Sequence, residues 1–569
     1  MTPRDPSQLV SDLAALAASS GRSAGKEIEA QVLVVGAGPV GLTLAMDLAS
    51  RGVQVLIAES RRADEPPSVK CNHVAARSME QFRRLGVAAA VREAGLPGDY
   101  PHDVAFRTSV TGIELNRVHI PARAERVHDQ TGPDGWWPTP EPPHRVNQIY
   151  LEPILAAHAA RMPGLTLMHG MQVTGFLQDE AGVTANACKR DDGTVHRIRC
   201  HYLVGCDGGR SLVRKIIGAR FEGTDVVQRV QSTFLRAPSL RELIPGRLAW
   251  GFQSYNARRC GTTFAIDGRE LWLVHNHLNP GEDPARVDRD RSLRAILGVD
   301  SSFEYEVLAK EDWVARRLVA DRFRDRRVFI CGDAAHIWIP QAGYGMNAGI
   351  ADAMNLSWML AACLDGWAPP RILDAHEAER LPITEQVSRL AMSMGLSKIK
   401  VRTALPENLE EDSAEGRATR DAFGRTLHDL NVQQFCCAGL NFGYFYDRSP
   451  LIVYDGEQAP PFTMGSFESS TVPGCRCPHF WLRDGRSLYD ELGPGYTLLR
   501  FSPVAAVDAF MEAACRLGVP MTLLELGAED VPPVYRHALV LVRPDQHIAW
   551  RADSIPTDVT GLVDRIRGG

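Results

Sequence analysis

The residues with the clearest chemical potential form a glycine turn near the start of the chain. This turn follows the apolar run at 30–35 in the pattern Gly-x-Gly-x-x-Gly, and it consists of Gly36, Gly38, Pro39, Val40 and Gly41. Such a turn lets backbone approach a pyrophosphate, and the helix that follows offers unpaired N–H donors and positive potential. The chemistry indicated is the binding of a phosphorylated dinucleotide.

An acidic residue follows at the spacing that a dinucleotide requires. The apolar run at 53–58 predicts the second strand of a βαβ unit, and Glu59 and Ser60 stand at its carboxyl end. A carboxylate about 20 residues beyond the glycine turn binds the hydroxyls of a ribose. This fingerprint leaves open whether the dinucleotide is NAD or FAD.

Two further buried strands run into turns that carry a carboxylate. Tyr202–Gly205 precedes Asp207 in an Asp-Gly turn, and Val328–Cys331 precedes Gly332 and Asp333. Asp207 fits a turn-forming residue as well as it fits a ligand. Directly after Asp333 a second glycine loop opens a long Ala/Leu/Met helix; its notable residues are Pro340, Gly343, Gly345, Met346 and Asn347. A helix N-terminus at this loop is suited to stabilise negative charge on a bound group.

The elements that position these residues predict an α/β protein of several domains. Three strand–turn–helix units place residues 30–110, 145–224 and 321–400 in one doubly wound domain. The segment 225–320 has short alternating runs of aromatic and β-branched residues, which are typical of a mostly antiparallel sheet. Residues 98–144 are predicted to form an irregular excursion.

The two ends of the chain differ from this central part. Residues 1–29 are predicted to be a disordered leader. A helical segment and linker occupy 400–461, and 462–569 is predicted to be a small α/β unit.

Composition excludes several classes of function. The 569 residues carry a net charge of −6 without long runs of one sign, so nucleic acid is not expected as a partner. An apolar stretch of about 18 residues, as a membrane span needs, is absent, and we expect a cytoplasmic protein. The twelve cysteines lack the spacing of a zinc site, so they are predicted to be reduced thiols and no metal is expected.

Taken together and in this order, the three motifs resemble the single-component (class A) FAD-dependent aromatic hydroxylases, which include 4-hydroxybenzoate hydroxylase and phenol hydroxylase. The sequence Pro-x-Ala-Gly-x-Gly-Met-Asn at 340–347 most resembles the phenol hydroxylase and polyketide aromatic hydroxylase branch. The resemblance implies a Rossmann-like FAD-binding domain of the glutathione-reductase type with an inserted antiparallel substrate sheet. The tail resembles that branch's thioredoxin-like C-terminal domain.

The resemblance also implies roles for single residues. The glycine turn would hold the FAD pyrophosphate, Glu59 the adenosine ribose, and Asp333 the ribityl chain and pyrophosphate. Lys70 or Arg77 would take a phosphate, and Gln148 would contact the flavin side. Backbone N–H groups of Gly345–Asn347 would lie at the flavin ring, and Asp207 would serve FAD packing and the reductant.

The chain departs from the family pattern at two places. Where 4-hydroxybenzoate hydroxylase has paired prolines, this sequence has Ile339-Pro340, so the carbonyl geometry at the reaction centre is left open. The tail has no Cys-x-x-Cys, and its nearest match is Cys475-x-Cys477, which favours packing or dimer contact over disulfide exchange.

The expected activity is that of an NAD(P)H-consuming monooxygenase that hydroxylates a phenolic or polyketide aromatic ring with O2 through a flavin C4a-hydroperoxide. NAD(P)H would visit only transiently, because the sequence shows one dinucleotide fingerprint. Baeyer–Villiger or epoxidising chemistry, or an FAD protein that shields a reactive intermediate without turnover, are the alternatives. His275 alternates with His277 on a strand of the substrate sheet, and is either a satisfied core imidazole or a catalytic group. A homodimer is compatible with the sequence, which does not identify the base that activates the phenol.

Overall fold

The glycine turns follow the strands of one parallel sheet, at its carboxyl edge. The computed structural model describes residues 24–126, 128–129, 131–527 and 531–569. The strand order in this sheet is β16 (Arg324–Asp325), β17 (Val328–Ile330), β10 (Tyr202–Gly205), β2 (Val32–Val35), β3 (Val55–Ala58) and β6 (Leu165–Met168). Neighbouring strands are parallel except for the short β16. Because both faces are covered, β2, β3 and β10 are buried along their whole length, which explains their continuous apolar sequence.

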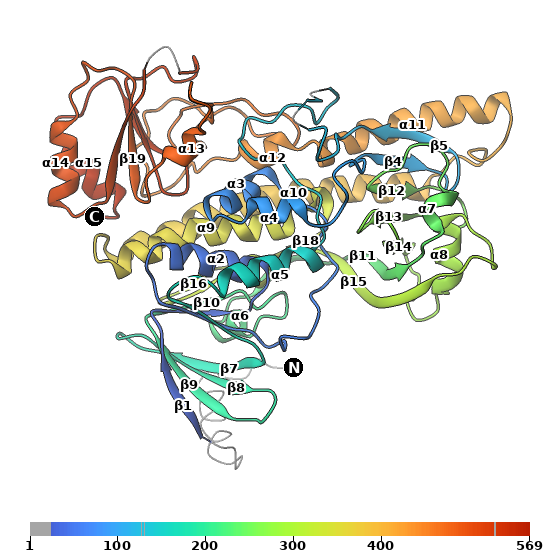
Figure 1. Cartoon of the computed structure of the whole chain (residues 1–569), viewed down its shortest axis with the longest axis horizontal. Helices are drawn as coiled ribbons and strands as arrows, with labels where there is room; N and C mark the ends of the chain where they lie inside the picture. Colours follow the sequence, from blue (N-terminus) through green and yellow to red (C-terminus); the bar gives the residue numbers. More distant parts are fainter. Residues whose placement is uncertain (1–23, 127, 130, 528–530) are drawn as a thin grey trace.

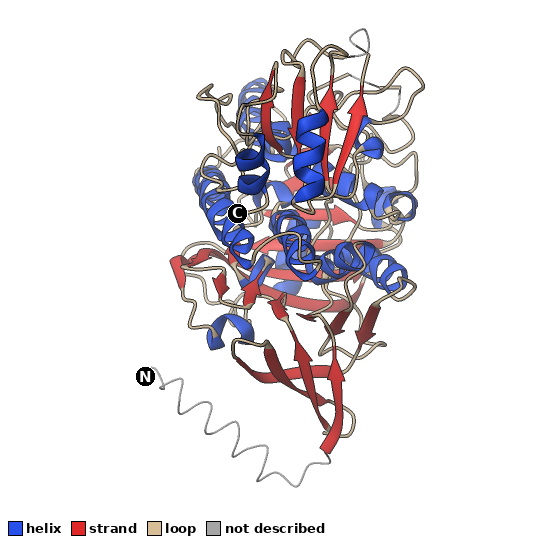
Figure 2. Cartoon of the chain, turned by 90° about the vertical axis from the view of Figure 1, so that its left-hand side faces the viewer, coloured by secondary structure: helices blue, strands red, loops and turns tan. Residues whose placement is uncertain are grey.

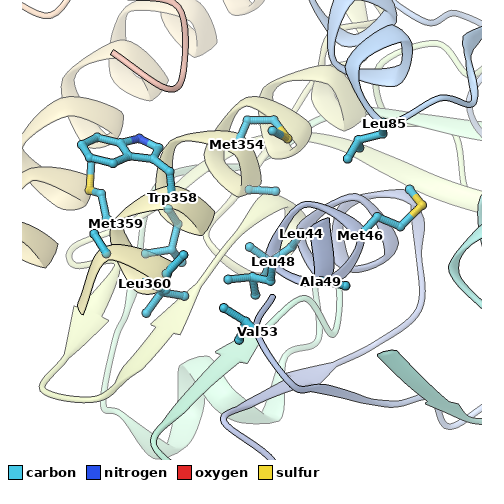
Figure 3. Close-up of a cluster of buried hydrophobic side chains, with 14 of the residues drawn as sticks. Leu44, Met46, Leu48, Ala49, Val53, Leu85, Met354, Trp358, Met359 and Leu360 are labelled. Atoms are coloured by element: carbon cyan, nitrogen blue, oxygen red, sulfur yellow. The ribbon is translucent and has the colours of Figure 1, made fainter. Parts of the chain in front are cut away.

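Helices cover one face of this parallel sheet. They are α2 (Pro39–Ser50), α3 (Ala76–Arg84), α4 (Ala88–Glu93), α5 (Gln148–Ala159) and α9 (Gly345–Leu364), and α6 (Leu212–Ile216) follows β10. Figure 3 shows Leu44 and Leu48 of α2 facing the α9 side, where Trp358 and Leu360 are fully or almost fully buried. This packing joins the helix after the first glycine turn to the helix after the second.

The opposite face packs on a four-stranded sheet of order β1-β9-β8-β7. Its strands are β1 (Ala24–Glu29), β7 (Met171–Gln178), β8 (Val183–Lys189) and β9 (Val195–Cys200). The predicted disordered leader is therefore wrong for residues 24–29, which pair in parallel with β9. The remainder of that leader lies outside the described residues.

An eight-stranded sheet, at the right of Figure 1, forms the second domain. Its order is β18 (His336–Trp338), β15 (Glu306–Ala320), β11 (Phe221–Arg236), β14 (Leu271–His277), β13 (Gly261–Ala265), β12 (Gly251–Ser254), β4 (Val104–Arg107) and β5 (Glu114–Val118), and α7 (Leu240–Leu243) and α8 (Arg289–Leu297) accompany it. The sheet is antiparallel except where β4 runs parallel to β12, which confirms the mostly antiparallel prediction.

The predicted irregular excursion at 98–144 is wrong in part. It contributes β4 and β5 to the eight-stranded sheet, so residues 104–107 belong to this sheet and not to the domain predicted over 30–110. Proline and glycine around these short strands hide them in the sequence, while their pairing partner β12 is far away in the chain.

Two long helices run lengthwise through the molecule, and the second of them lies against β4 and β5 at the upper right of Figure 1. They are α10 (Asp374–Thr403) and α11 (Ala414–Phe435), followed by α12 (Ala438–Phe442). Residues 404–413, which include four acidic side chains, separate α10 from α11. Three 3-10 turns, η1 (Gly332–Ala334), η2 (Gln341–Gly343) and η3 (Pro370–Leu373), connect the strands and helices around α9.

The C-terminal domain has a thioredoxin-like arrangement, at the top of Figure 2. Its strands β19 (Tyr496–Arg500), β20 (Met521–Glu525), β21 (Leu539–Val542) and β22 (Ile548–Ala552) have the order β20-β19-β21-β22, with α13 (Leu488–Glu491), α14 (Asp508–Arg516) and α15 (Val559–Ile566). β19 is parallel to β20 and antiparallel to β21. This order confirms the predicted thioredoxin-like tail.

Buried ion pairs attach the C-terminal domain to the rest of the chain. Arg543 contacts Glu379 of α10 at 2.5 Å, and Arg476 pairs with Glu80 of α3. All four side chains are almost completely buried. Among the helices that the structure describes, we found none with the length and apolar character of a membrane span.

Candidate dinucleotide site and active site

The first glycine turn has the backbone geometry that its glycines predict. Gly36 has φ +103°, and a Cβ there would lie 2.5 Å from the carbonyl oxygen of Cys206. A Cβ on Gly41 would lie 2.0 Å from the Gly36 oxygen, so neither position accepts a side chain. At Gly38, by contrast, a Cβ would meet no atom within 4 Å. Two glycines thus close the turn, while the third leaves a face open for a ligand.

Glu59 is fixed beside this turn. Its Oε2 accepts a hydrogen bond from the Ala37 N–H at 2.6 Å, and its Oε1 accepts one from the Arg61 N–H at 2.7 Å. Arg61 also pairs with Glu152, whose other oxygen accepts from the Gln148 amide at 2.8 Å. This chain of contacts links Glu59 to Gln148. Ser60 lies next to Glu59 and is exposed.

Asp333 carries a carboxylate that faces solvent. Its neighbours Gly332 and Ala334 are buried, and within the described residues its side chain makes no hydrogen bond or ion pair. Poor solvation by the surrounding protein raises its pKa, and the charges of His336 and Lys70 oppose this effect. An exposed, unpaired acceptor beside a glycine is suited to bind hydroxyl groups.

The carboxylate of Asp352, on α9, contacts the backbone at Gly332 and the side chains of His336 and Arg380. Its Oδ2 accepts from the Gly332 N–H at 3.1 Å and lies 2.6 Å from His336 Nε2, and its Oδ1 accepts from Arg380 Nε at 2.8 Å. Although burial raises the pKa of Asp352, the charges of His336 and Arg380 hold it well below its usual range. Sequence reasoning missed this residue, because its partners come from three separate elements.

The second glycine loop is strained and well anchored. Ala342 and Gly343 have φ +61° and +60°, a region that disfavours a side chain such as that of Ala342. Asn347 Oδ1 accepts from the Ala75 N–H at 2.8 Å, and its Nδ2 donates to the Gly343 oxygen at 2.7 Å. The Asn347 side chain therefore serves as a clamp between the loop and the segment before α3.

The start of α9 remains open. Gly345 and Met346 are partly exposed, and a Cβ on Gly345 would meet no atom within 4 Å. The first turn of a helix has N–H groups without intrahelical acceptors, and Ala348 is the first residue of α9 whose N–H reaches back, to the Tyr344 oxygen. Pro340, just before η2, is exposed as well. The loop thus presents free donors next to an open space.

The two candidate phosphate ligands lie in different environments. Lys70 is exposed and contacts Glu311 at 2.6 Å. Its positive charge also opposes the rise in the pKa of Asp333. Arg77 is buried and donates to Glu80, to Gln546 and to the Asp545 oxygen of the C-terminal domain. The donors of Arg77 are used in the domain contact, which favours Lys70 over Arg77 as the phosphate ligand.

Asp207 acts within its own turn. It accepts hydrogen bonds from the N–H groups of Leu212 and Val213, at 2.7 and 3.2 Å, and from the Ser211 hydroxyl. These contacts satisfy free donors at the start of α6, so the turn-forming interpretation explains this carboxylate.

His275 lies on β14 of the eight-stranded sheet, among aromatic side chains. Its Nδ1 is 2.6 Å from the Ser232 hydroxyl, which also accepts from the Trp313 indole at 2.8 Å. Loss of solvation lowers the pKa of His275 to about 4, so the ring is neutral near pH 7. Four further aromatic side chains on or beside the strands of this sheet are buried in its core; they are Trp250, Phe252, Tyr255 and Trp272.

A buried lysine next to the second glycine loop was also missed. Lys398 of α10 donates to Gln341 Oε1 at 3.2 Å, and burial with the nearby charge of Arg402 lowers its pKa to about 7. The sequence offers three cations in this part of the helix, with Lys400 between the other two. Which of them turns inward depends on tertiary packing.

These features fit FAD. The open face at Gly38, the buried carboxylate of Glu59 and the free carboxylate of Asp333 follow β2, β3 and β17, at the carboxyl edge of one parallel sheet, where nucleotide ligands bind in such sheets. The open N-terminus of α9 adds donors for a ring that becomes negatively charged when it is reduced. Among the described residues, no group of three or more His, Cys, Asp or Glu side chains is placed to hold a metal ion.

Comparison with known proteins agrees with this site. Residues 29–391 match the model of an FAD binding domain, and residues 470–568 match that of the aromatic-ring hydroxylase C-terminal domain. The chain is 30% identical to the FAD-dependent monooxygenase apdD of Emericella nidulans, over 92% of this chain and 88% of that protein. It is 29% identical to phenol 2-monooxygenase of Pseudomonas sp., over 95% of this chain and 93% of that protein.

The structural comparison points to the same family. The solved structure of RebC soaked with chromopyrrolic acid and holding 7-carboxy-K252c has a TM-score of 0.86 and 34% identity, covering 95% of this chain and 99% of that one. The chain therefore belongs to the FAD-dependent aromatic-ring hydroxylases.

Proposed function

We propose that this protein hydroxylates a phenolic or polyketide aromatic ring, with NAD(P)H as electron donor and O2 as oxidant. The observation that carries the proposal is the exposed carboxylate of Asp333 beside the open N-terminus of α9, at the border of the eight-stranded sheet. The likeness to phenol 2-monooxygenase over nearly the whole chain supports this choice of substrate.

The proposed roles follow from the positions of the side chains. The Gly36–Gly41 turn binds the pyrophosphate through its open backbone face, Glu59 binds the adenosine ribose, and Asp333 binds hydroxyls of the ribityl chain. Lys70 supplies positive charge near the phosphates, and Gln148 contacts the flavin side. Bound FAD supplies the activation of O2 and the transfer of one oxygen atom.

The loop before α9 forms the proposed reaction centre. The free N–H groups of Gly345, Met346 and Asn347 stabilise negative charge at the ring, and the Asn347 clamp keeps these donors in place. Pro340 and the sheet around His275 orient the aromatic substrate and exclude water. NAD(P)H binds transiently, since only one fingerprint with its acidic partner occurs in the sequence.

A substrate screen tests the proposal. The holoenzyme is incubated with phenols, naphthols and quinones, and we expect at least one of them to stimulate NAD(P)H oxidation and to gain one oxygen atom. Nuclear magnetic resonance of the product separates a new ring hydroxyl from Baeyer–Villiger insertion or epoxidation. An FAD-loaded protein whose NAD(P)H oxidation no ligand stimulates would instead fit a non-turnover binding protein.

A cytoplasmic location and a homodimer remain predictions. The cysteines of the described residues form no disulfide with one another, which is compatible with a reducing compartment. Sedimentation of the purified holoenzyme tests the dimer.

A further inference from the structure

Two cations on α10, the buried Lys398 and the half-buried Arg402, lack a carboxylate partner within the described residues. Lys398 and Arg402 lie one helical turn apart, and neither forms an ion pair within the described residues. Lys398 donates only to Gln341, and Arg402 Nη2 donates to Gln228 Oε1 at 3.2 Å. Arg402 Nε is buried without a partner. Buried charges in proteins are normally paired, so this arrangement calls for an anion.

The groups around these cations do not compensate their charge. His277 faces both of them, its Nδ1 has no partner, and burial together with the charge of Arg402 lowers its pKa well below the usual range. His275, next on the same strand face, is neutral near pH 7 because its pKa is also lowered. Burial raises the pKa of Tyr255 and of Cys260, so both are neutral too. The cluster therefore has a net positive charge.

The cluster lies next to the proposed reaction centre. A Cβ on Gly395 would lie 2.4 Å from Ile339 Cδ1, so α10 packs closely on the loop that contains Pro340. Gln341, the next residue along, holds the Lys398 ammonium at 3.2 Å. His277 belongs to β14 of the eight-stranded sheet. Lys398 and Arg402 thus lie between the loop and the sheet.

We propose that Lys398 and Arg402 bind a carboxylate of the aromatic substrate, so that the substrate is an aromatic acid. An ammonium and a guanidinium one turn apart match the two oxygens of a carboxylate, and charge-assisted hydrogen bonds of this kind are strong. This assignment rests on the proposed function in one respect, namely that the bound carboxylate belongs to the substrate.

Equilibrium binding tests the proposal without turnover. The FAD holoenzyme is titrated with 1-hydroxy-2-naphthoate and with its methyl ester, and flavin difference spectra give the Kd. We expect the acid to bind at least about tenfold more tightly than the ester. Lys398→Met and Arg402→Leu should weaken acid binding by about tenfold and change ester binding less than about twofold. Lys400→Met, an exposed lysine on the same helix, should bind both ligands as the unchanged protein does.

A pH series distinguishes recognition of charge from a structural role. In the unchanged protein the acid should bind more weakly as the pH rises above about 7, because the Lys398 ammonium loses its proton. Lys398→Arg should keep tight acid binding up to pH 9, since arginine stays protonated.

The proposal is overturned if the ester binds as tightly as the acid, if Lys398→Met weakens both ligands equally, or if the acid does not bind at all. The same pH dependence in Lys398→Arg would also overturn it. A protein that binds the acid selectively but never oxidises NAD(P)H would refute the proposed function and leave this inference standing.

Discussion

The backbone N–H of Gly332 donates a hydrogen bond to the buried carboxylate of Asp352 at 3.1 Å. This contact joins the end of β17 to the first half of α9, the two elements that carry the free carboxylate of Asp333 and the open N–H donors. The position of one half of the flavin site is thereby fixed relative to the other.

Asp352→Asn should weaken both the fold and the retention of FAD. The substitution leaves Arg380 without its buried carboxylate, and breaking such a pair costs about 3–5 kcal/mol of unfolding free energy. Chemical denaturation and FAD release on dilution measure the two effects. Asp365→Asn, at the exposed end of the same helix, is the matched control and should change neither.

Asp333→Ala should release FAD while it leaves the fold intact. The residue is exposed, and its carboxylate makes no hydrogen bond or ion pair within the described residues, so we expect its loss to affect mainly the contacts with the ligand. A hydrogen bond to a charged group is worth about 1.5–3 kcal/mol, which corresponds to roughly a hundredfold in affinity at the upper end. Full FAD occupancy of this variant after gel filtration would show that Asp333 does not bind the cofactor.

Two glycines on α9 should respond differently to alanine. A Cβ on Gly349 would lie 2.6 Å from Val40 Cγ2 and 2.8 Å from Gly332 Cα, so Gly349→Ala should destabilise the protein by about 1–3 kcal/mol. Gly345→Ala meets open space and should fold normally, but its methyl group occupies the face proposed for the flavin. Thermal unfolding and FAD content separate the two effects. Equal melting temperatures would contradict the close contact of α2, η1 and α9.

The buried ion pair between Arg543 of the C-terminal domain and Glu379 of α10 should contribute to the stability of the chain. Arg543→Met leaves Glu379 buried without its cation and should cost about 3–5 kcal/mol. The double variant Arg543→Met with Glu379→Gln should recover part of this loss, because it removes one of the two buried carboxylates that Arg543 pairs with, the other being Asp545. Arg536→Met is an exposed control, expected within about 0.5 kcal/mol of the unchanged protein. No recovery in the double variant would indicate that packing, not charge, holds the domains together.

The free energy of unfolding should depend on pH because Lys398 is buried. Its pKa is about 7 in the folded chain, against about 10.4 for an exposed lysine, so the unfolded chain binds more protons between these values. The cost of burying the ammonium is therefore fully present below pH 7 and disappears as the pH rises toward 10, at up to about 1.4 kcal/mol per pH unit. Lys398→Met should be more stable than the unchanged protein at pH 6, and this advantage should shrink by pH 9. An advantage independent of pH would show that Lys398 stays protonated in the folded chain as it does in the unfolded chain, so that burial does not lower its pKa.

The strand–turn–helix motifs could be predicted because their signal is local. A buried parallel strand is a continuous apolar run, and the glycines at Gly36 and Gly332 follow it directly. The alternating runs of the eight-stranded sheet and the order of elements in the tail could be predicted for the same reason. Local sequence left Asp207 open between a turn-forming residue and a ligand, and its contacts with the start of α6 favour the first interpretation.

The features that were missed depend on distant partners. β1 has the sequence Ala-Gly-Lys-Glu-Ile-Glu, which lacks an apolar run, and its strand geometry comes from pairing with β9. Arg77 precedes its partners in the C-terminal domain by more than 460 residues, so no spacing rule reveals that its donors are used there. Lys398 and Lys400 are alike in sequence, and only the contact with Gln341 separates them.

The parallel pairing of β4 with β12 also constrains how the chain is synthesised and folded. The two strands are separated by roughly 150 residues, and a ribosome adds about 5–20 residues per second, so β4 waits on the order of 10 s for its neighbour. During this interval its unpaired edge is open to incorrect partners, including another nascent chain. A chimera that exchanges only the segment 225–320 between relatives would leave β12 beside a foreign β4, and for this reason such a graft must include residues 104–118 as well.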